Sequence, residues 1–116
     1  MPDRVVRLTR PAPAPEAVAV AALLLSAAKA PVILAGGGAV GAADALRRLA
    51  EALDAPLAMT TNGRGILPPG HPLGVSLTAS MPATRALIAG ADAVLAIGTE
   101  MGPTDYDMYE DGGFAI

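Results

Sequence analysis

The sequence has 116 residues, of which 53% are hydrophobic and 16% charged, with a formal net charge of -3. This length predicts one compact domain that buries roughly 65% of the unfolded chain's surface, while the negative charge and the two Tyr, one Phe and no Trp argue against nucleic-acid binding. The absence of Cys excludes a disulfide scaffold, a Cys-ligated metal and a thiol nucleophile.

The amino-terminal segment is rich in proline. Its prolines recur at alternate positions, which favours extended polyproline II structure, at Pro11, Pro13 and Pro15. We therefore expect residues 1–14 to form a proline-rich linker or arm and residues 15–116 to form the folded domain. Asp3 and Glu16 argue against a secretory signal over the same stretch, and a cytoplasmic location is expected.

An Ala/Leu-rich helix is predicted from Pro15 to about Lys29. It is apolar nearly all round, so we expect it to be buried between other elements. Its apolar stretch falls short of the roughly 20 residues that span a bilayer, so no membrane span is expected.

Short apolar runs at 32–35, 57–60 and 93–97 predict three buried strands. Helices are predicted between them, one from about Val40 to Leu53 and one that has Pro82 inside its first turn and stops at Gly90. We expect Ser80 or nearby backbone to cap the second of these helices. The order predicts an α/β fold, a three-layer Rossmann-like parallel sheet with helices on both faces. Three strands are few for such a sheet, so an open edge and a truncated domain are expected.

The first strand leads into a glycine-rich loop. Gly36, Gly37, Gly38, Ala39, Val40 and Gly41 satisfy G-x-G-x-x-G between a predicted strand and helix, where the backbone can approach a pyrophosphate. The second strand lacks the acid that would hold a ribose hydroxyl, because Asp54 precedes that strand. Two interpretations stay open: a nucleotide-binding loop, or glycines that permit a tight turn and close packing.

Two further loops follow the other strands and add candidate site residues: Asn62, Gly63, Arg64, Gly98, Thr99 and Glu100. The carboxyl ends of parallel strands share one edge of a sheet, so the three loops should converge there. Arg64 is a candidate for binding a phosphate, and the alternatives are a solvated side chain or a pair with Glu100.

Other polar residues carry weaker signals. His71, the single histidine, lies between glycine and proline and is expected to pack a loop. The acidic residues at 105–111 do not have EF-hand spacing and predict a solvated turn. We assign no catalytic residue and no metal ligand.

Four segments, in this order and spacing, resemble the central domain of thiamine diphosphate-dependent enzymes such as acetolactate synthase, benzoylformate decarboxylase and oxalyl-CoA decarboxylase. They are residues 31–39 (PVILAGGGA), 49–56 (LAEALDAP), 60–65 (TTNGRG) with His71-Pro72, and 91–99 (ADAVLAIGT). Residues 102–107 (GPTDYD) further resemble the branch that acts on guanidino-type 2-oxo acids.

The resemblance implies a three-domain parent enzyme in which this middle domain does not perform the chemistry. Thiamine diphosphate and Mg²⁺ would belong to the parent and would not be bound by this chain, which lacks the family's Gly-Asp-Gly motif with its following Asn. In some members the middle domain holds FAD or ADP, and residues 36–39, 62–64 and 98–100 would line that site. The implied partners are the other two domains and further copies of the enzyme.

The leading hypothesis is a noncatalytic central-domain fragment of a thiamine diphosphate-dependent 2-oxo acid lyase or transferase, inactive by itself. One alternative is an independent Rossmann-type nucleotide-binding module, for which the missing ribose-binding acid counts against NAD. Another is a structural self-association domain that pairs through its open sheet edge.

Overall fold

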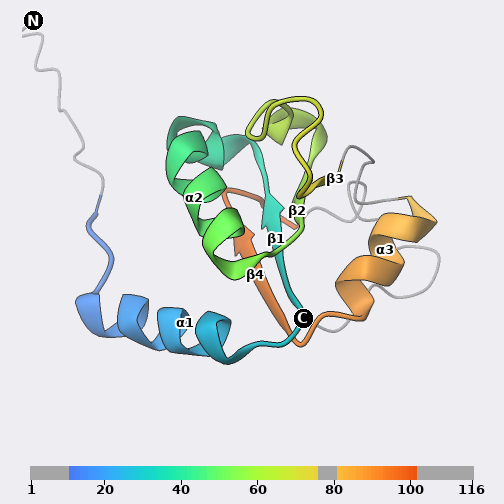
Figure 1. Ribbon diagram of the computed structural model, residues 1–116. Helices are drawn as coiled ribbons and strands as arrows, with labels where there is room; N and C mark the ends of the chain where they lie inside the picture. The colour runs from blue at the N-terminus through green and yellow to red at the C-terminus, as the bar shows by residue number, and fades with distance from the viewer. Residues whose placement is uncertain (1–10, 76–80, 102–116) are drawn as a thin grey trace, which may run out of the picture.

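The structure, a computed structural model, describes residues 11–75 and 81–101. Four strands form one parallel sheet in the order β3-β2-β1-β4 (Figure 1). In chain order the elements are α1 (Pro15–Ala27), β1 (Pro31–Ala35), the 3-10 helix η1 (Gly37–Ala42), α2 (Ala43–Leu53), β2 (Leu57–Met59), the 3-10 turn η2 (Thr61–Gly63), β3 (Gly74–Val75), α3 (Pro82–Ala89) and β4 (Ala93–Ile97). The predicted α/β class is confirmed.

Strand β1 lies at the centre of the sheet, and all five of its residues are buried. It pairs along its whole length with β4, from Pro31 beside Ala93 to Ala35 beside Ile97. On its other side, residues 33–35 pair with β2. A continuous apolar run suits this position, because a parallel strand covered on both faces has no side in water.

Side chains of β1 alternate between two apolar layers. Ile33 and Ala35 belong to one cluster with Leu46 and Ala50 of α2. A second cluster joins Val32 and Leu34 of β1 to Ile88 of α3, among other residues. Helices α2 and α3 therefore cover opposite faces of the sheet, as the three-layer prediction requires.

The start of the second helix differs from the prediction. The chain leaves β1 through the 3-10 helix Gly37–Ala42, and regular α-helix begins at Ala43. No side chain caps α2, whose end at Asp54 adopts a left-handed backbone with φ of 50°. A 3-10 helix is tighter than an α-helix and suits a short turn from strand to helix.

The predicted loop after β2 contains a strand that the sequence analysis missed. Gly74 and Val75 form β3, which pairs with Leu57 and Ala58 of β2. Two residues next to a Pro- and Gly-rich stretch give too short an apolar pattern to identify. Short strands of this kind are common at sheet edges.

Two expectations about burial were wrong. Helix α1 has no buried residue, and Leu23 and Leu24 on it are 71% and 64% exposed. In Figure 1 its amino-terminal half extends away from the sheet, and it ends at Ala27 rather than near Lys29. Strand β4, expected to be buried, is only partly so, because it occupies an edge of the sheet.

Helix α3 has Pro82 in its first turn and its C-cap at Gly90, as predicted. Ser80, the predicted cap, lies outside the described residues, and the observed N-cap position is Met81. Among the helices within residues 11–75 and 81–101, none is long and apolar enough to cross a membrane.

Candidate functional site

The three predicted loops meet at the carboxyl edge of the sheet, at the upper end of β1 in Figure 1. Backbone hydrogen bonds tie the first loop to the third: Gly36 N–H donates to Ile97 O at 3.0 Å and Gly38 N–H donates to Gly98 O at 2.9 Å. The second loop is joined through Thr60 N–H, which donates to Ala35 O at 3.0 Å.

Glycines are required where these loops touch, because each fits directly against another backbone. A Cβ on Gly36 would overlap the carbonyl oxygen of Gly98 and lie 2.8 Å from Thr99 Cα. A Cβ on Gly63 would overlap the carbonyl oxygen of Ala35. Gly98 combines a close approach to Ala39 with a positive φ of 63°. The close-packing role considered for the first loop therefore operates across all three.

Three amides of the first glycine loop are engaged in hydrogen bonds within the chain. In a dinucleotide-binding fold, free N–H groups of the glycine loop and helix N-terminus bind the phosphates. Here Gly36 and Gly38 donate to the third loop, and Ala39 N–H donates to Gly36 O at 3.0 Å. These three amides would have to exchange their protein acceptors to bind a phosphate.

The structure brings most of the predicted site residues together. A Cβ on Gly37 would lie 2.9 Å from Cβ of Asn62, so the first and second loops also touch there. The residues that converge are Gly36, Gly37, Gly38, Ala39, Asn62, Gly63, Gly98 and Thr99.

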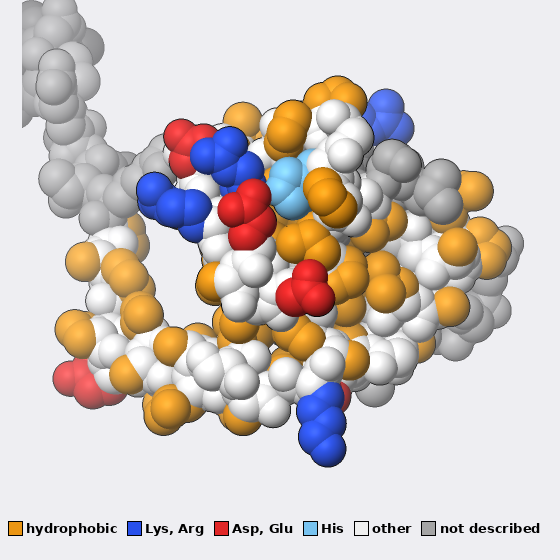
Figure 2. Space-filling view, viewed as in Figure 1, with side chains coloured by type: hydrophobic (Ala, Val, Ile, Leu, Met, Phe, Trp, Pro, Cys, Tyr) orange, Lys and Arg blue, Asp and Glu red, His pale blue; other side chains and the backbone are white. Residues whose placement is uncertain are grey.

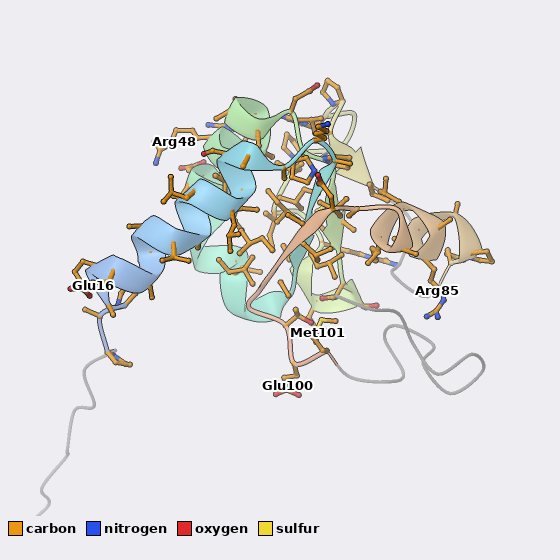
Figure 3. All side chains as sticks on the ribbon, turned by 90° about the horizontal axis from the view of Figure 1, so that it is seen from below. Glu16, Arg48, Arg85, Glu100 and Met101 are labelled. Carbon is orange, nitrogen blue, oxygen red and sulfur yellow. The ribbon has the colours of Figure 1, made fainter. Side chains whose placement is uncertain are left out.

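The two charged candidates do not form a pair. Arg64 is exposed, and within residues 11–75 and 81–101 no ion pair links it to Glu100. Glu100 is exposed and projects away from the molecule in Figure 3, as does Arg48 of α2. Beside Glu100, Thr99 Oγ1 accepts a hydrogen bond from Met101 N–H at 3.3 Å.

Arg64 lines a separate cavity of about 370 Å³. This β2–β3 pocket lies against the carboxyl ends of β2 and β3 and is bounded by Met59, Arg64, Gly65, Leu67, Pro68, Pro69, Gly70, His71, Gly74 and Val75.

His71 holds the wall of the β2–β3 pocket. Its Nδ1 accepts a hydrogen bond from Leu73 N–H at 3.1 Å, so in the neutral ring the proton lies on Nε2. Nε2 then donates to Glu51 Oε1 of α2 at 3.0 Å. The side chain is only 11% exposed, and Figure 2 shows the histidine in pale blue among side chains of the molecule's surface. The loop-packing role expected for His71 is confirmed.

Asp92 was missed by the sequence analysis, and it organises the opposite, amino edge of the sheet. Its carboxylate accepts hydrogen bonds from Lys29 N–H at 2.7 Å and from Ala30 N–H at 2.8 Å. These bonds hold the pKa of Asp92 below its usual range. The sequence feature that could have indicated this role is an Asp between the end of a helix and the start of a strand, because Asp side chains readily accept hydrogen bonds from backbone N–H groups.

The residues that the structure describes offer little metal chemistry. Among residues 11–75 and 81–101, no group of three or more His, Asp or Glu side chains could hold a metal ion. The acidic stretch at 105–111 and the segment 102–107 lie outside the described residues.

Residues 18–115 match the protein-family model described as "Thiamine pyrophosphate enzyme, central domain". Thiamine pyrophosphate is another name for thiamine diphosphate. The matched range contains the three glycine loops and every element from β1 to β4.

The chain is also similar in sequence to curated proteins named as a decarboxylase, an acetyltransferase and an acetolactate synthase subunit. The chain is 45% identical over 97 residues to the probable 2-ketoarginine decarboxylase AruI of Pseudomonas aeruginosa, covering 84% of this chain and 17% of the relative. It is 44% identical over 104 residues to a probable sulfoacetaldehyde acetyltransferase of Rhizobium meliloti, covering 86% of this chain and 18% of that protein. It is 32% identical over 99 residues to the large subunit of acetolactate synthase isozyme 1 of Escherichia coli, covering 84% and 18%. The chain thus spans less than a fifth of the length of these relatives.

Proposed function

The chain belongs to the thiamine pyrophosphate enzyme family as a central domain, and from this premise we propose that it is a noncatalytic scaffold within a larger enzyme. The domain holds a rigid sheet whose loop edge is closed on itself, and the chemistry takes place on other domains. The scaffold comprises residues 15–116, preceded by the linker or arm at 1–14.

The observation that carries this proposal is the interlocking of the glycine loops. Gly36 and Gly38 donate their amides to the loop after β4, at 3.0 and 2.9 Å. The backbones of the two loops lie so close that neither Gly36 nor Gly98 has room for a Cβ. Loops that hydrogen-bond to one another and pack backbone against backbone fix the relative position of three strand ends. A scaffold requires such a fixed geometry.

The parent enzyme that we propose is a thiamine diphosphate-dependent lyase or transferase acting on 2-oxo acids. Support comes from relatives named as a decarboxylase, an acetyltransferase and an acetolactate synthase subunit. When bound, the cofactor would supply carbanion stabilisation for such reactions. The described residues do not fit Mg²⁺, because they present no cluster of acids for the metal. We place the cofactor site, with Mg²⁺, on the other two domains of a cytoplasmic homo-oligomer.

A second candidate function is the binding of FAD or ADP at residues 36–39, 62–64 and 98–100. The convergence of three glycine-bearing loops at the carboxyl edge favours it, since ligands of open α/β sheets bind there. The engaged amides and the exposed acid Glu100 count against it, because both disfavour a phosphate.

Calorimetric titration of the purified chain separates the two functions. The ligands are thiamine diphosphate with Mg²⁺, FAD, ADP and NAD, and circular dichroism first establishes that the chain is folded. The scaffold proposal predicts no saturable heat with any ligand. Saturable binding of FAD or ADP would support the second function, and binding of thiamine diphosphate or decarboxylation of a 2-oxo acid would contradict the scaffold.

A further inference from the structure

The β2–β3 pocket has the properties of a ligand site, and it lies beside the second glycine loop, from which it takes Arg64 and Gly65. Its volume of about 370 Å³ falls within the range of small-molecule pockets, roughly 300–1,000 Å³. Its walls are mainly apolar, with Met59, Leu67 and Val75 among them, and the charged side chain on it is Arg64. An apolar cavity with a single cation selects a ligand that has both an apolar body and an anionic group.

The loop that forms this pocket has a shape fixed by its sequence. Gly65 and Gly70 adopt positive φ angles of 91° and 84°, which residues with a Cβ rarely do. Nothing lies within 4 Å of a Cβ built on either glycine, so backbone conformation and not crowding requires them. Two sharp turns return the chain over the ends of β2 and β3.

Hydrogen bonds then fasten the loop to the rest of the domain. His71 links it to Glu51 of α2 and to its own Leu73. Leu57 N–H of β2 donates to Leu73 O at 2.8 Å, which ties the far end of the loop to the sheet. A wall held at several points does not have to be ordered when a ligand binds, so less binding free energy is lost.

Arg64 has its donors available. Within residues 11–75 and 81–101 it makes no ion pair. By contrast, Arg47 Nη2 lies 3.8 Å from Asp44 Oδ1, and His71 Nε2 is hydrogen-bonded to Glu51 Oε1. A guanidinium offers two parallel N–H donors that match a carboxylate or a phosphate. The glycine loops do not use this side chain, although it follows Gly63 directly in sequence.

We propose that the β2–β3 pocket binds a small organic anion, an apolar body bearing one carboxylate or phosphate, with Arg64 as the anchor of the anionic group. The apolar body lies against Met59, Leu67 and Val75, and Arg64 closes the site at its exposed side. The site shares Arg64 with the residues considered for FAD or ADP, but Met59, Leu67 and Val75 belong only to the pocket. A lack of nucleotide binding at the glycine loops therefore leaves this proposal unaffected.

The test uses the full chain with ¹³C-labelled methionine methyl groups, because Met59 lines the pocket and reports on it by NMR. A Met59→Leu variant assigns the Met59 signal among the five methionines. The probes are phenyl phosphate, benzoate, inorganic phosphate and benzyl alcohol, titrated into the unaltered chain, Arg64→Gln and the control Arg48→Gln on the exposed side of α2.

The proposal predicts that phenyl phosphate or benzoate shifts the Met59 signal saturably. The probe with the higher affinity shows whether the site prefers a phosphate or a carboxylate. Arg64→Gln weakens that binding about tenfold, as expected for losing a charge-assisted hydrogen bond, while Arg48→Gln leaves it unchanged. The proposal would be overturned by no saturable shift with either anion, by equal affinity in Arg64→Gln, or by equal binding of benzyl alcohol. Equal binding of inorganic phosphate would show that the apolar body plays no part and would also overturn it.

Discussion

At the scale of single residues, Gly36 and Gly41 form a matched pair within one glycine loop. A Cβ on Gly36 would overlap Gly98 O, whereas nothing lies within 4 Å of a Cβ on Gly41. We predict that Gly36→Ala lowers the free energy of unfolding by about 1–3 kcal/mol through overpacking. Gly41→Ala should raise it by about 0.5 kcal/mol by restricting the unfolded chain. Urea denaturation of both variants measures the difference, and equal stabilities would show that the loops are not interlocked.

The stabilisation that Asp92 provides should depend on pH. Its folded-state pKa is lowered by the bonds from Lys29 and Ala30, so the unfolded chain takes up the proton first as pH falls. The stabilisation is complete above the unfolded-state pKa of an Asp and is lost as pH falls through the folded-state value. Asp92→Asn should therefore have a lower thermal midpoint at pH 7, and the gap to the unaltered chain should close in acid.

The control for Asp92 is Asp54→Asn. Asp54 is exposed at the end of α2 in a left-handed conformation that Asn also tolerates. The Asp54→Asn variant should have a thermal midpoint close to that of the unaltered chain at each pH measured. A gap for Asp92→Asn that is constant from neutral to acid pH would rule out the role of the carboxylate charge.

The convergence of the glycine loops could be predicted from the sequence, because the carboxyl ends of parallel strands share one edge of the sheet. Gly36–Ala39, Gly63 and Gly98 do come together. The partner of each amide was not predictable, since whether a loop donor faces a ligand or a neighbouring loop depends on contacts distant in sequence. For the same reason the position of Arg64 on another cavity could not be foreseen.

At the scale of elements, α1 and α2 differ in how much packing holds them. Leu23 of α1 is 71% exposed, while Leu46 of α2 is 3% exposed within the cluster that contains Ile33. We predict that Leu46→Ala costs about 2–5 kcal/mol of unfolding free energy, whereas Leu23→Gln changes it by less than about 0.5 kcal/mol. Denaturation of the two variants tests this, and a large loss for Leu23→Gln would show that α1 packs in the folded chain.

The predictability of each element follows from its pattern. Strand β1 and helix α3 were identified because an apolar run, a Pro at the start and a Gly at the end mark their limits. Helix α1 was placed correctly in sequence but wrongly in space, because a helix that is apolar on all sides does not indicate which side is covered. Strand β3 has too few residues to give a period at all.

At the scale of the whole molecule, the alternation of strands and helices was enough to predict a parallel sheet with two covered faces. The strand order β3-β2-β1-β4 places the glycine loops of β1 and β4 side by side. The family follows from the matched central-domain model over residues 18–115. The exposed apolar side chains of α1 and the partly exposed β4 could not be predicted, since local sequence does not show which strand forms the edge.

The claim that the glycine loops are closed on one another is tested most directly by amide hydrogen exchange, followed by NMR on the full chain. The amides of Gly36, Gly38 and Thr60 donate to Ile97, Gly98 and Ala35. We predict that their exchange is slowed at least about a hundredfold relative to an unstructured chain, because it requires local opening. Exchange of these amides at the unstructured rate in a folded chain would show instead that the loop edge is open and its donors are free.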